Sequence, residues 1–426
     1  MFNAKDFGAK GDGISLNTDA IQSAIDACHN AGGGTVIIEN GTYKTGKIFM
    51  RSNVNLHIDI NAVLLGSENT DDFPESSDEE ASHITTDNLP RWRNSCLIFA
   101  NECENISITG MGKIDCNGEN FIYRKENCTS GWKYARKNLP TPPRVVFFTG
   151  CNNVLIQDVT MVNQPAGWSY WIHDCDYVKI DGLKIFADVN YPNNDGIHIN
   201  CSRNVTISNC DITCGDDAII VRANSKSLKE NKVCEKVTVT NCNLTSYSGG
   251  IRLGWYNDGV IRNCVFSNIV MTDTTNGINI VLPFLNQDKP KTFENSGMAD
   301  IGREATLIEN ISFNNIIMHK IRQRPLRIMV SKNEQVRLEG IRNIHFTNLH
   351  ATALAYPEIV GRDDMKIKNI SFSDCTFERI SPDVFENAMF HGANSHLEND
   401  TNTASYMHME NAANVTVNNT RFDTLI

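Results

Sequence analysis

The chain has 426 residues, of which 41% are hydrophobic and 21% charged, and its formal net charge is −11. The hydrophobic content is enough to form a core, and no apolar run approaches the roughly 18 residues that a membrane-spanning helix needs, so the composition excludes a disordered chain and a helical membrane protein. The acidic balance argues against a nucleic-acid backbone as a partner. We therefore expect a soluble globular protein with neither nucleic acid nor membrane as partner, and the sequence leaves its oligomeric state open.

The 14 cysteines are thinly spread for a disulfide framework. The first eleven residues contain no charged segment followed by an apolar one, so we expect no signal peptide and a cytoplasmic location with reduced cysteines. Cys210 and Cys214 have no second pair at zinc-site spacing. We expect no metal and no cofactor.

The amino end predicts an amphipathic helix over residues 17–32. Ala20, Ile21, Ala24 and Ile25 fall on one stripe, and three glycines follow the end of the helix. Because the open end of a repetitive β-structure invites aggregation, we expect this helix to cover the first repeat.

One short pattern then returns along the chain: a small polar residue, an alternating Val/Ile strand, an Asn or Asp, and a second strand. Repeats of this form begin at Asn105, Asn153, Tyr177, Asn204, Lys236, Asn310, Asn343, Asn369 and Asn414. Their spacing of about 22 to 33 residues is typical of solenoids. Such units cannot bury their apolar faces alone, and stacking them as coils of a parallel β-helix forms one continuous interior.

Many of the asparagines that begin these strands lie in Asn-X-Ser/Thr sequences. They are Asn105, Asn204, Asn243, Asn310, Asn369 and Asn414. We interpret them as turn residues that stack into ladders, because Asn tolerates turn geometry and can bond to its neighbours, and not as glycosylation sites.

Three polar insertions interrupt the repeats, at residues 67–94, 117–143 and 287–304. Insertions leave a β-helix from its turns, so we expect these loops to wall a groove along one flank.

Several strands share one pattern. Each follows a polar or glycine turn and reads apolar, variable, apolar. If the apolar residues point inward, strand alternation places the variable residues outward in one column. The column comprises His198, Ile220, Arg252, Asn279 and Arg327.

Three aspartates fall at the turns that enter two of these strands: Asp195 before the first, and Asp216 and Asp217 before the second. Three carboxylates this close cannot all ionise at normal cost, so we expect one to hold a proton near neutral pH while another stays charged. A glycosidase needs this combination, since one acid protonates the glycosidic oxygen and one carboxylate activates water. An Asp before a strand can also be a simple turn residue, but the cluster of three beside His198 and Arg252 favours catalysis.

At these residues the chain resembles glycoside hydrolase family 28, the polygalacturonase-like enzymes. The resemblance rests on Phe7-Gly-Ala-Lys-Gly-Asp-Gly, Gly32-Gly-Gly-Thr-Val, Trp168-Ser-Tyr-Trp-Ile-His173, Pro192-Asn-Asn-Asp-Gly and Gly215-Asp-Asp-Ala-Ile. It implies an all-β fold, a single right-handed parallel β-helix over residues 1–426, and an inverting mechanism. It also implies that Asp195 and Asp217 hold the attacking water and that Asp216 is the general acid.

The chain departs from the family at two motifs. The Gly-His-Gly motif aligns with Ser248-Gly249-Gly250, and the Arg-Ile-Lys motif, which in the family holds a galacturonate carboxylate, aligns with Asn279-Ile280-Val281. Arg252, Arg222 or Arg327 could bind the carboxylate instead, because a guanidinium binds it bidentately, or each could be a solvated outer strand residue.

Aromatic residues in the loops or beside the aspartates can stack on the apolar face of a sugar. They are Trp92, Trp132, Tyr134 and Trp255. The candidate substrate-binding residues are Asn193, His198, Arg222, Arg252, Asn279, Arg327 and Trp255.

The leading interpretation is a glycosidase that cleaves galacturonate-containing, pectic-type oligosaccharides by inversion, and the long insertions favour exo action. Three alternatives stay open: a glycosidase of the same fold acting on a neutral sugar, a β-helix polysaccharide lyase, which needs calcium and a Lys or Arg base, and a non-catalytic carbohydrate-binding protein.

Overall fold

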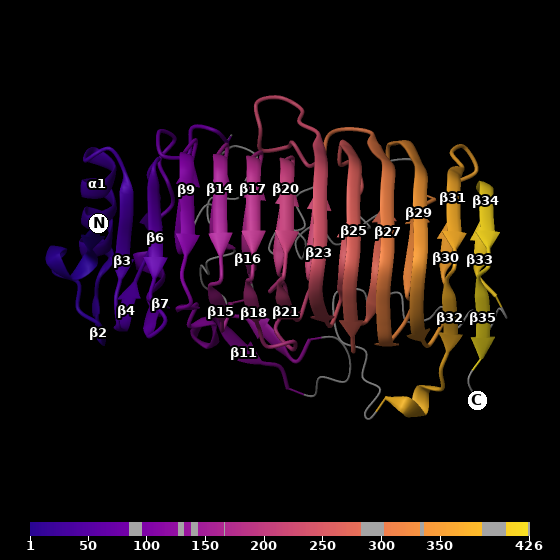
Figure 1. Cartoon of the computed structure of the whole chain (residues 1–426), viewed down its shortest axis with the longest axis horizontal. Helices are drawn as coiled ribbons and strands as arrows, with labels where there is room; N and C mark the ends of the chain where they lie inside the picture. The colour runs from indigo at the N-terminus through magenta and orange to yellow at the C-terminus, as the bar shows by residue number, and fades with distance from the viewer. Residues whose placement is uncertain are drawn as a thin grey trace.

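The structure is a computed structural model, and it describes residues 1–84, 96–126, 132–137, 144–165, 167–282, 302–332, 336–385 and 406–424. Strands stand side by side along the long axis, with the N-terminal coils at one end and the C-terminal coils at the other (Figure 1). Strands of successive coils pair in parallel, as in Tyr170↔Ile197 followed by Ile197↔Ile219. The chain therefore folds as the predicted parallel β-helix.

One side of the coil is an eleven-stranded parallel sheet. Its strands are β5 (Ile48–Phe49), β8 (Ile98–Asn101), β13 (Arg144–Thr149), β16 (Trp168–His173), β19 (Ile197–Asn200), β22 (Ile219–Arg222), β24 (Gly249–Leu253), β26 (Asn276–Leu282), β28 (Leu326–Val330), β30 (Glu358–Val360) and β33 (His408–Glu410). The outward column predicted from the sequence lies on this sheet.

The other sides form a bent 22-stranded sheet. Its first run contains β1 (Phe2–Asn3), β3 (Gly34–Ile38), β6 (Val54–Ile58), β9 (Glu104–Thr109), β14 (Asn152–Gln157), β17 (Asp176–Asp181), β20 (Arg203–Ser208), β31 (Ile367–Ser373) and β34 (Ala412–Asn418). Its second run contains β2 (Asp12–Leu16), β4 (Gly41–Thr45), β7 (Ala62–Gly66), β10 (Lys113–Asp115), β15 (Thr160–Val162), β18 (Lys184–Phe186), β21 (Asp211–Cys214), β32 (Thr376–Arg379) and β35 (Arg421–Thr424). Four long strands belong to both runs: β23 (Cys234–Ser246), β25 (Val260–Thr272), β27 (Thr306–Ile321) and β29 (Leu338–Ala353).

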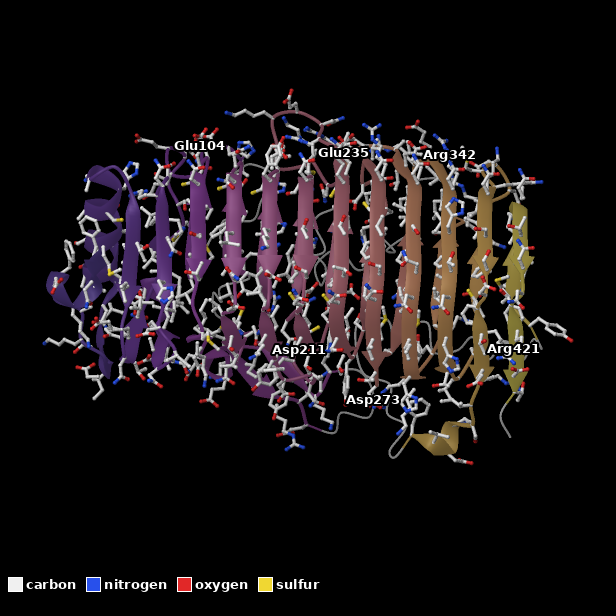
Figure 2. All side chains as sticks on the ribbon, in the orientation of Figure 1. Glu104, Asp211, Glu235, Asp273, Arg342 and Arg421 are labelled. Atoms are coloured by element: carbon white, nitrogen blue, oxygen red, sulfur yellow. The ribbon has the colours of Figure 1, made fainter. Side chains whose placement is uncertain are left out.

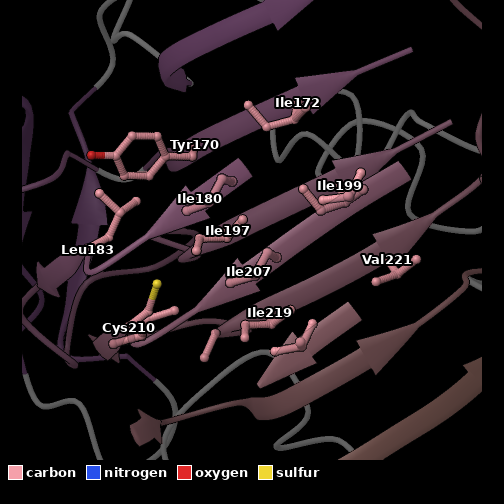
Figure 3. Packing of buried hydrophobic residues seen from close by; sticks show 14 of the residues in the cluster. Tyr170, Ile172, Ile180, Leu183, Ile197, Ile199, Ile207, Cys210, Ile219 and Val221 are labelled. Carbon is pink, nitrogen blue, oxygen red and sulfur yellow. The ribbon is translucent and has the colours of Figure 1, made fainter. Parts of the chain in front are cut away.

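The core fills the inside of the coil. Tyr170, Ile197 and Ile219 of the eleven-stranded sheet line the same interior as Ile180 and Ile207 of the larger sheet (Figure 3). Equivalent side chains stack from coil to coil: the rings of Phe266, Phe313, Phe346 and Phe372 follow one another at centroid distances of 4.9, 5.1 and 5.0 Å. These distances match the strand spacing of about 4.8 Å, so each coil places the same residue type over the last.

Asparagine ladders run along the corners, as predicted. Each of the six Asn-X-Ser/Thr asparagines donates its amide Nδ2 to an Asn or Asp of the preceding coil. The pairs are Asn105 to Asn53, Asn204 to Asp176, Asn243 to Asp211, Asn310 to Asn263, Asn369 to Asn343 and Asn414 to Asn369. All except Asn243 have a positive φ, which Asn adopts at low cost.

Charged side chains gather at the turns. Glu104, Glu235 and Arg342 lie along one long edge of the strands, and Asp211, Asp273 and Arg421 lie along the other (Figure 2). Two of these residues form ion pairs between coils. Glu235 pairs with Arg262 at 2.7 Å, and Arg342 pairs with Glu309 at 2.7 Å. Such partly exposed pairs contribute little stability, in contrast to the buried charges of the site below.

The amphipathic segment near the amino end forms α1 (Thr18–Asn30). It buries Ile21, Ala24, Ile25 and Cys28 against the first coil, and Ala20 packs at the edge of the same core. A short 3-10 helix, η1 (Ala4–Phe7), lies beside it. The helix therefore covers the apolar end of the coil.

The predicted insertions are described in part. Segment 67–94 is described up to residue 84 and contains η2 (Thr70–Asp72). Segment 117–143 contains η5 (Gly118–Phe121) and a hairpin of β11 (Ile122–Arg124) and β12 (Tyr134–Arg136). In segment 287–304, only the last three residues are described. Trp92 also lies outside the described residues. One further 3-10 helix, η6 (Pro382–Val384), follows β32.

The thirteen cysteines of the described ranges are buried free thiols. Several donate to a carbonyl two residues earlier at a corner, as Cys151 does to Thr149 at 3.4 Å. No helix of the described chain is long and apolar enough to cross a bilayer. The cytoplasmic location stays a prediction, which cell fractionation would test.

Candidate active site

The outward column forms as the sequence predicts. On the eleven-stranded sheet, successive strands pair His198 with Ile220, Ile220 with Arg252, Arg252 with Asn279, and Asn279 with Arg327. Trp171 precedes this column and Glu358 follows it. All of these outward residues are buried.

The three aspartates meet at the entrance to β19 and β22. Asp195, Asp216 and Asp217 are 5%, 4% and 3% exposed, and one carboxylate oxygen of each lies within 4.8 Å of the others. The amide of Gly196 donates to the carbonyl oxygen of Asp217 at 3.0 Å, which fixes the two turns relative to each other. Separate coils thus bring together three acids that the sequence places on neighbouring rungs.

Burial and mutual repulsion keep protons on this cluster. Burial raises the pKa of Asp195 well above its ordinary value, and the charges of Asp216 and Asp217 add to the effect. Burial, followed by repulsion from Asp217, raises the pKa of Asp216 to about 7. The carboxyl groups of Asp195 and Asp216 therefore retain proton occupancy near neutral pH.

Asp217 differs from its neighbours because it has a cationic partner. Arg252 Nη1 donates to Asp217 Oδ2 at 2.8 Å, and the hydroxyl of Ser248 donates to Asp217 Oδ1 at 3.0 Å. The guanidinium carbon of Arg252 lies 4.3 Å from the ring centroid of Trp255. Asp217 thus accepts a charge-assisted hydrogen bond, whereas the donors to Asp216 are neutral.

Asp216 is oriented by two weaker donors. Asn193 Nδ2 donates to Asp216 Oδ2 at 3.1 Å, and the backbone amide of Asp217 donates to Asp216 Oδ1 at 3.0 Å. Asn193 has a φ of 52° and also accepts a long hydrogen bond of 3.5 Å from Arg136 on β12. The insertion 117–143 therefore contributes to the orientation of the acid.

His198 packs face-on against an aromatic wall. Its ring centroid lies 4.0 Å from that of Trp168, and the guanidinium carbon of Arg144 lies 3.5 Å from the Trp168 ring on β16. Burial lowers the pKa of His198 well below 6.5, and Arg222 and Arg144 lower it further, so the ring is neutral. Sequence reasoning did not place Arg144 or Trp168 at the site, although the run that begins at Trp168 carried part of the family resemblance.

Two of the candidate carboxylate-binding arginines already have acidic partners. Arg222 donates to Asp258 from Nε at 2.9 Å and from Nη2 at 2.6 Å, and Arg327 donates from Nε to Glu358 Oε2 at 2.8 Å. All four residues are at least nine-tenths buried. Neither arginine is therefore a solvated outer strand residue, and the carboxylate-binding role of each stays a prediction. The partners escaped prediction because Asp258 lies 36 residues from Arg222 and Glu358 lies 31 from Arg327, in segments with no motif.

Polar atoms without a partner collect around the aspartates. Within the described ranges, Asp195 Oδ1, His198 Nδ1 and Asn279 Oδ1 are buried and have no hydrogen-bond partner. Buried polar atoms are normally satisfied, so these three atoms, one at the acid turn and two in the outward column, mark a place where ligand hydroxyl groups can bind. Asn279, in the position of the lost Arg-Ile-Lys motif, lies beside Asp217, and its substrate-binding role stays a prediction.

Comparison with known proteins agrees with this geometry. The sequence model of the family described as "Glycosyl hydrolases family 28" matches residues 80–386. The chain belongs to this family. A second family, "Rhamnogalacturonase A/epimerase, pectate lyase-like", matches residues 1–112. The predicted family resemblance is confirmed.

Relatives of this family 28 member include a probable polygalacturonase of Vitis vinifera, 27% identical over 282 residues that make up 65% of this chain and 55% of the relative. An exo-poly-alpha-D-galacturonosidase of Dickeya chrysanthemi is 26% identical over 344 residues, or 72% of this chain and 56% of the relative. The chain thus spans little more than half the length of both.

The structure of a hyperthermoactive exopolygalacturonase from Thermotoga maritima superimposes with a TM-score of 0.71 at 22% identity, over 99% of this chain and 92% of that one. This likeness confirms the right-handed parallel β-helix fold.

Proposed function

We propose that the protein is a glycosidase that cleaves galacturonate-containing, pectic-type oligosaccharides by inversion. The observation that carries the proposal is the buried cluster of Asp195, Asp216 and Asp217, in which a carboxyl group whose pKa is raised to about 7 lies within 4.8 Å of a carboxylate paired with Arg252. General acid and general base catalysis at one glycosidic bond requires this pair of states.

Each aspartate has its own role in this proposal. Asp216, whose pKa is about 7, donates its proton to the glycosidic oxygen, since an acid is most effective when its pKa lies near the working pH. Asp217, paired with Arg252, removes a proton from the attacking water. Asp195, kept neutral by burial, holds that water by hydrogen bonding and leaves the base role to Asp217.

The substrate class follows from the relatives and from the wall beside the acids. The relatives named above are a polygalacturonase and an exo-acting galacturonosidase. The hairpin of the 117–143 insertion lies against the turn of the acids, with the rings of Tyr134 and Tyr191 4.8 Å apart. A wall this close to the acid turn supports exo action, because it shortens the groove on one side.

A neutral sugar is the second candidate, and one observation favours it. Arg222, Arg252 and Arg327 each form a buried ion pair with an acid of the chain, Asp258, Asp217 and Glu358 respectively. A uronate carboxylate would compete with these internal partners, whereas a sugar hydroxyl would not.

Product release from a panel of oligosaccharides tests the function and separates the candidates. The panel contains galacturonate oligomers, mixed pectic oligomers and neutral oligomers of matched length, with and without a chelator. We expect saturated monosaccharide to be released from galacturonate-containing oligomers, with no effect of the chelator. Unsaturated products that disappear with chelator would identify a lyase, and no release from any oligomer would identify a binding protein.

A further inference from the structure

Both oxygens of Asp217 are held by donors from the next coil. Ser248 donates to Oδ1 at 3.0 Å from the turn before β24, and Arg252 donates to Oδ2 at 2.8 Å from within β24. Ser248 is fully buried and Arg252 is 6% exposed. A carboxylate held at both oxygens by buried donors has one orientation, and Asp217 meets this condition.

Gly249, between these donors, makes room for this arrangement. A Cβ atom at Gly249 would lie 2.6 Å from Asp217 Oδ1 and 3.0 Å from Asn279 Nδ2. Real Cβ atoms do not approach a neighbour this closely. Gly249 is the middle residue of the segment that aligns with Gly-His-Gly, so the family's histidine has no space here while Asp217 stays in place.

The guanidinium of Arg252 is fixed on a second side. Its carbon lies 4.3 Å from the ring centroid of Trp255, and the backbone amide of Trp255 donates to Asp258 Oδ2 at 3.0 Å. Asp258 is fully buried and pairs with Arg222. A continuous chain of contacts therefore runs from Arg222 through Asp258, the partly buried Trp255 and Arg252 to Asp217.

We propose that Arg252 is a positioning residue that, together with Ser248, holds Asp217 ionised and in one orientation opposite Asp216, and that it does not bind a substrate carboxylate. This inference rests on the proposed function. The role of Arg252 and Ser248 follows from the departure of residues 248–250 from the family's Gly-His-Gly motif. If Arg252 acts on Asp217, catalysis needs this arginine whichever sugar is cleaved.

Removing the guanidinium of Arg252 should change the pKa of Asp216 in a defined direction. The charged and titratable groups around Asp216 are Asp217 on the same turn, Asp195 on the preceding turn, Arg252 on the following strand, and the thiol of Cys214, which donates to the Asp216 carbonyl oxygen at 2.9 Å. Burial and Asp217 raise the pKa of Asp216, and Arg252 lowers it. Without Arg252 the acid keeps its proton to higher pH, so the alkaline limb of the pH–rate profile moves upward.

The experiment compares Arg252→Gln and Arg252→Lys with wild type on a uronate substrate and on its neutral analogue. Arg262→Gln is the matched control, because Arg262 forms a 2.7 Å pair with Glu235 on the other sheet. For Arg252→Gln we expect kcat to fall at least about tenfold on both substrates with little change in KM. We also expect the alkaline limb to rise by about one pH unit, as loss of a close opposite charge predicts. Arg252→Lys should restore the limb but only part of kcat, since an ammonium keeps the charge and loses the planar geometry.

Trp255→Leu covers the case in which Arg252→Gln does not fold. It leaves the ion pair intact but removes its support, and we expect a smaller fall in kcat that is again equal on both substrates. A rise in KM confined to the uronate would show that Arg252 is a clamp and would overturn the positioning role, as would an unmoved alkaline limb in a folded variant. A wild-type protein that is inactive on every substrate would overturn the proposed function itself.

Discussion

The indole N–H of Trp132 donates a 2.8 Å hydrogen bond to the carbonyl oxygen of Gly215, the residue directly before Asp216. The sequence leaves open whether Trp132 stacks on sugar or packs locally, and the structure gives it this contact with the acid turn. The insertion 117–143 thus fixes the backbone from which the acid projects.

Trp132→Phe keeps an aromatic ring and removes this hydrogen bond. We expect kcat to fall by about 2- to 10-fold, which corresponds to one hydrogen bond of about 0.5–1.5 kcal/mol, while KM changes little. Steady-state kinetics on the best substrate of the panel measure both. A rise in KM with unchanged kcat would instead show that the ring contacts the sugar.

Asp216→Asn removes the proposed general acid without changing the size of the side chain. We expect turnover of a substrate with a poor leaving group to fall by about a hundredfold or more, the usual contribution of acid catalysis. A substrate whose leaving group needs no proton should lose much less. Turnover within a few-fold of wild type on the poor leaving group would contradict the assignment of Asp216.

The same variant tests the electrostatic state of the cluster through stability. Because the pKa of Asp216 rises from 3.8 to about 7 on folding, the folded state binds the proton more tightly. The stabilisation is complete below the unfolded pKa and is lost as pH rises through about 7. Asp216→Asn has no such proton to lose, so its melting temperature relative to wild type should be higher at pH 8 than at pH 5.

Asp273→Asn is the control for this measurement, because the side chain of Asp273 is 51% exposed and lies at a turn of the other sheet. Its melting temperature relative to wild type should change little between the two pH values. An equal pH dependence for both variants would show that burial of Asp216 does not govern the effect.

The fold was predictable because its determinants repeat. Each coil carries its own alternating strands and its own Asn, and the column His198, Arg252, Asn279 and Arg327 follows from alternation alone. The outward residue of one coil can therefore be predicted from the equivalent residues of its neighbours. The same register brings the three aspartates together.

The partners of the site residues were not predictable in this way. Asp258 lies in the loop after β24, whose position depends on tertiary contacts and not on alternation. Glu358 begins β30, a short strand for which the sequence shows no repeat motif. Arg144 likewise reaches the site from the start of β13, where its guanidinium stacks on Trp168. Sequence periodicity predicts which strand residues point outward, whereas the contacts that loop residues make are known only from the three-dimensional structure.

The spacing of the carboxyl groups bears on the stereochemistry of cleavage. Oxygens of Asp195, Asp216 and Asp217 lie within 4.8 Å of one another. In glycosidases with two carboxyl groups, about 5–5.5 Å accompanies retention and about 6.5–9.5 Å accompanies inversion, so distance alone points to retention. The third carboxyl group changes this argument, because Asp195 and Asp217 can hold a water between them while Asp216 donates its proton.

We therefore expect single displacement, with the first-formed product in the opposite anomeric configuration to the bond cleaved. Each oxygen of Asp217 accepts one hydrogen bond, from Ser248 or from Arg252, which weakens it as a nucleophile but leaves a second lone pair that can accept a proton from water. The neutral Asp195 is a weaker nucleophile still. Water held between them is the remaining nucleophile. Proton NMR in the first minutes of hydrolysis, before mutarotation, measures the configuration directly. A product that keeps the starting configuration would require a covalent intermediate on one of the aspartates and would overturn the roles assigned to all three.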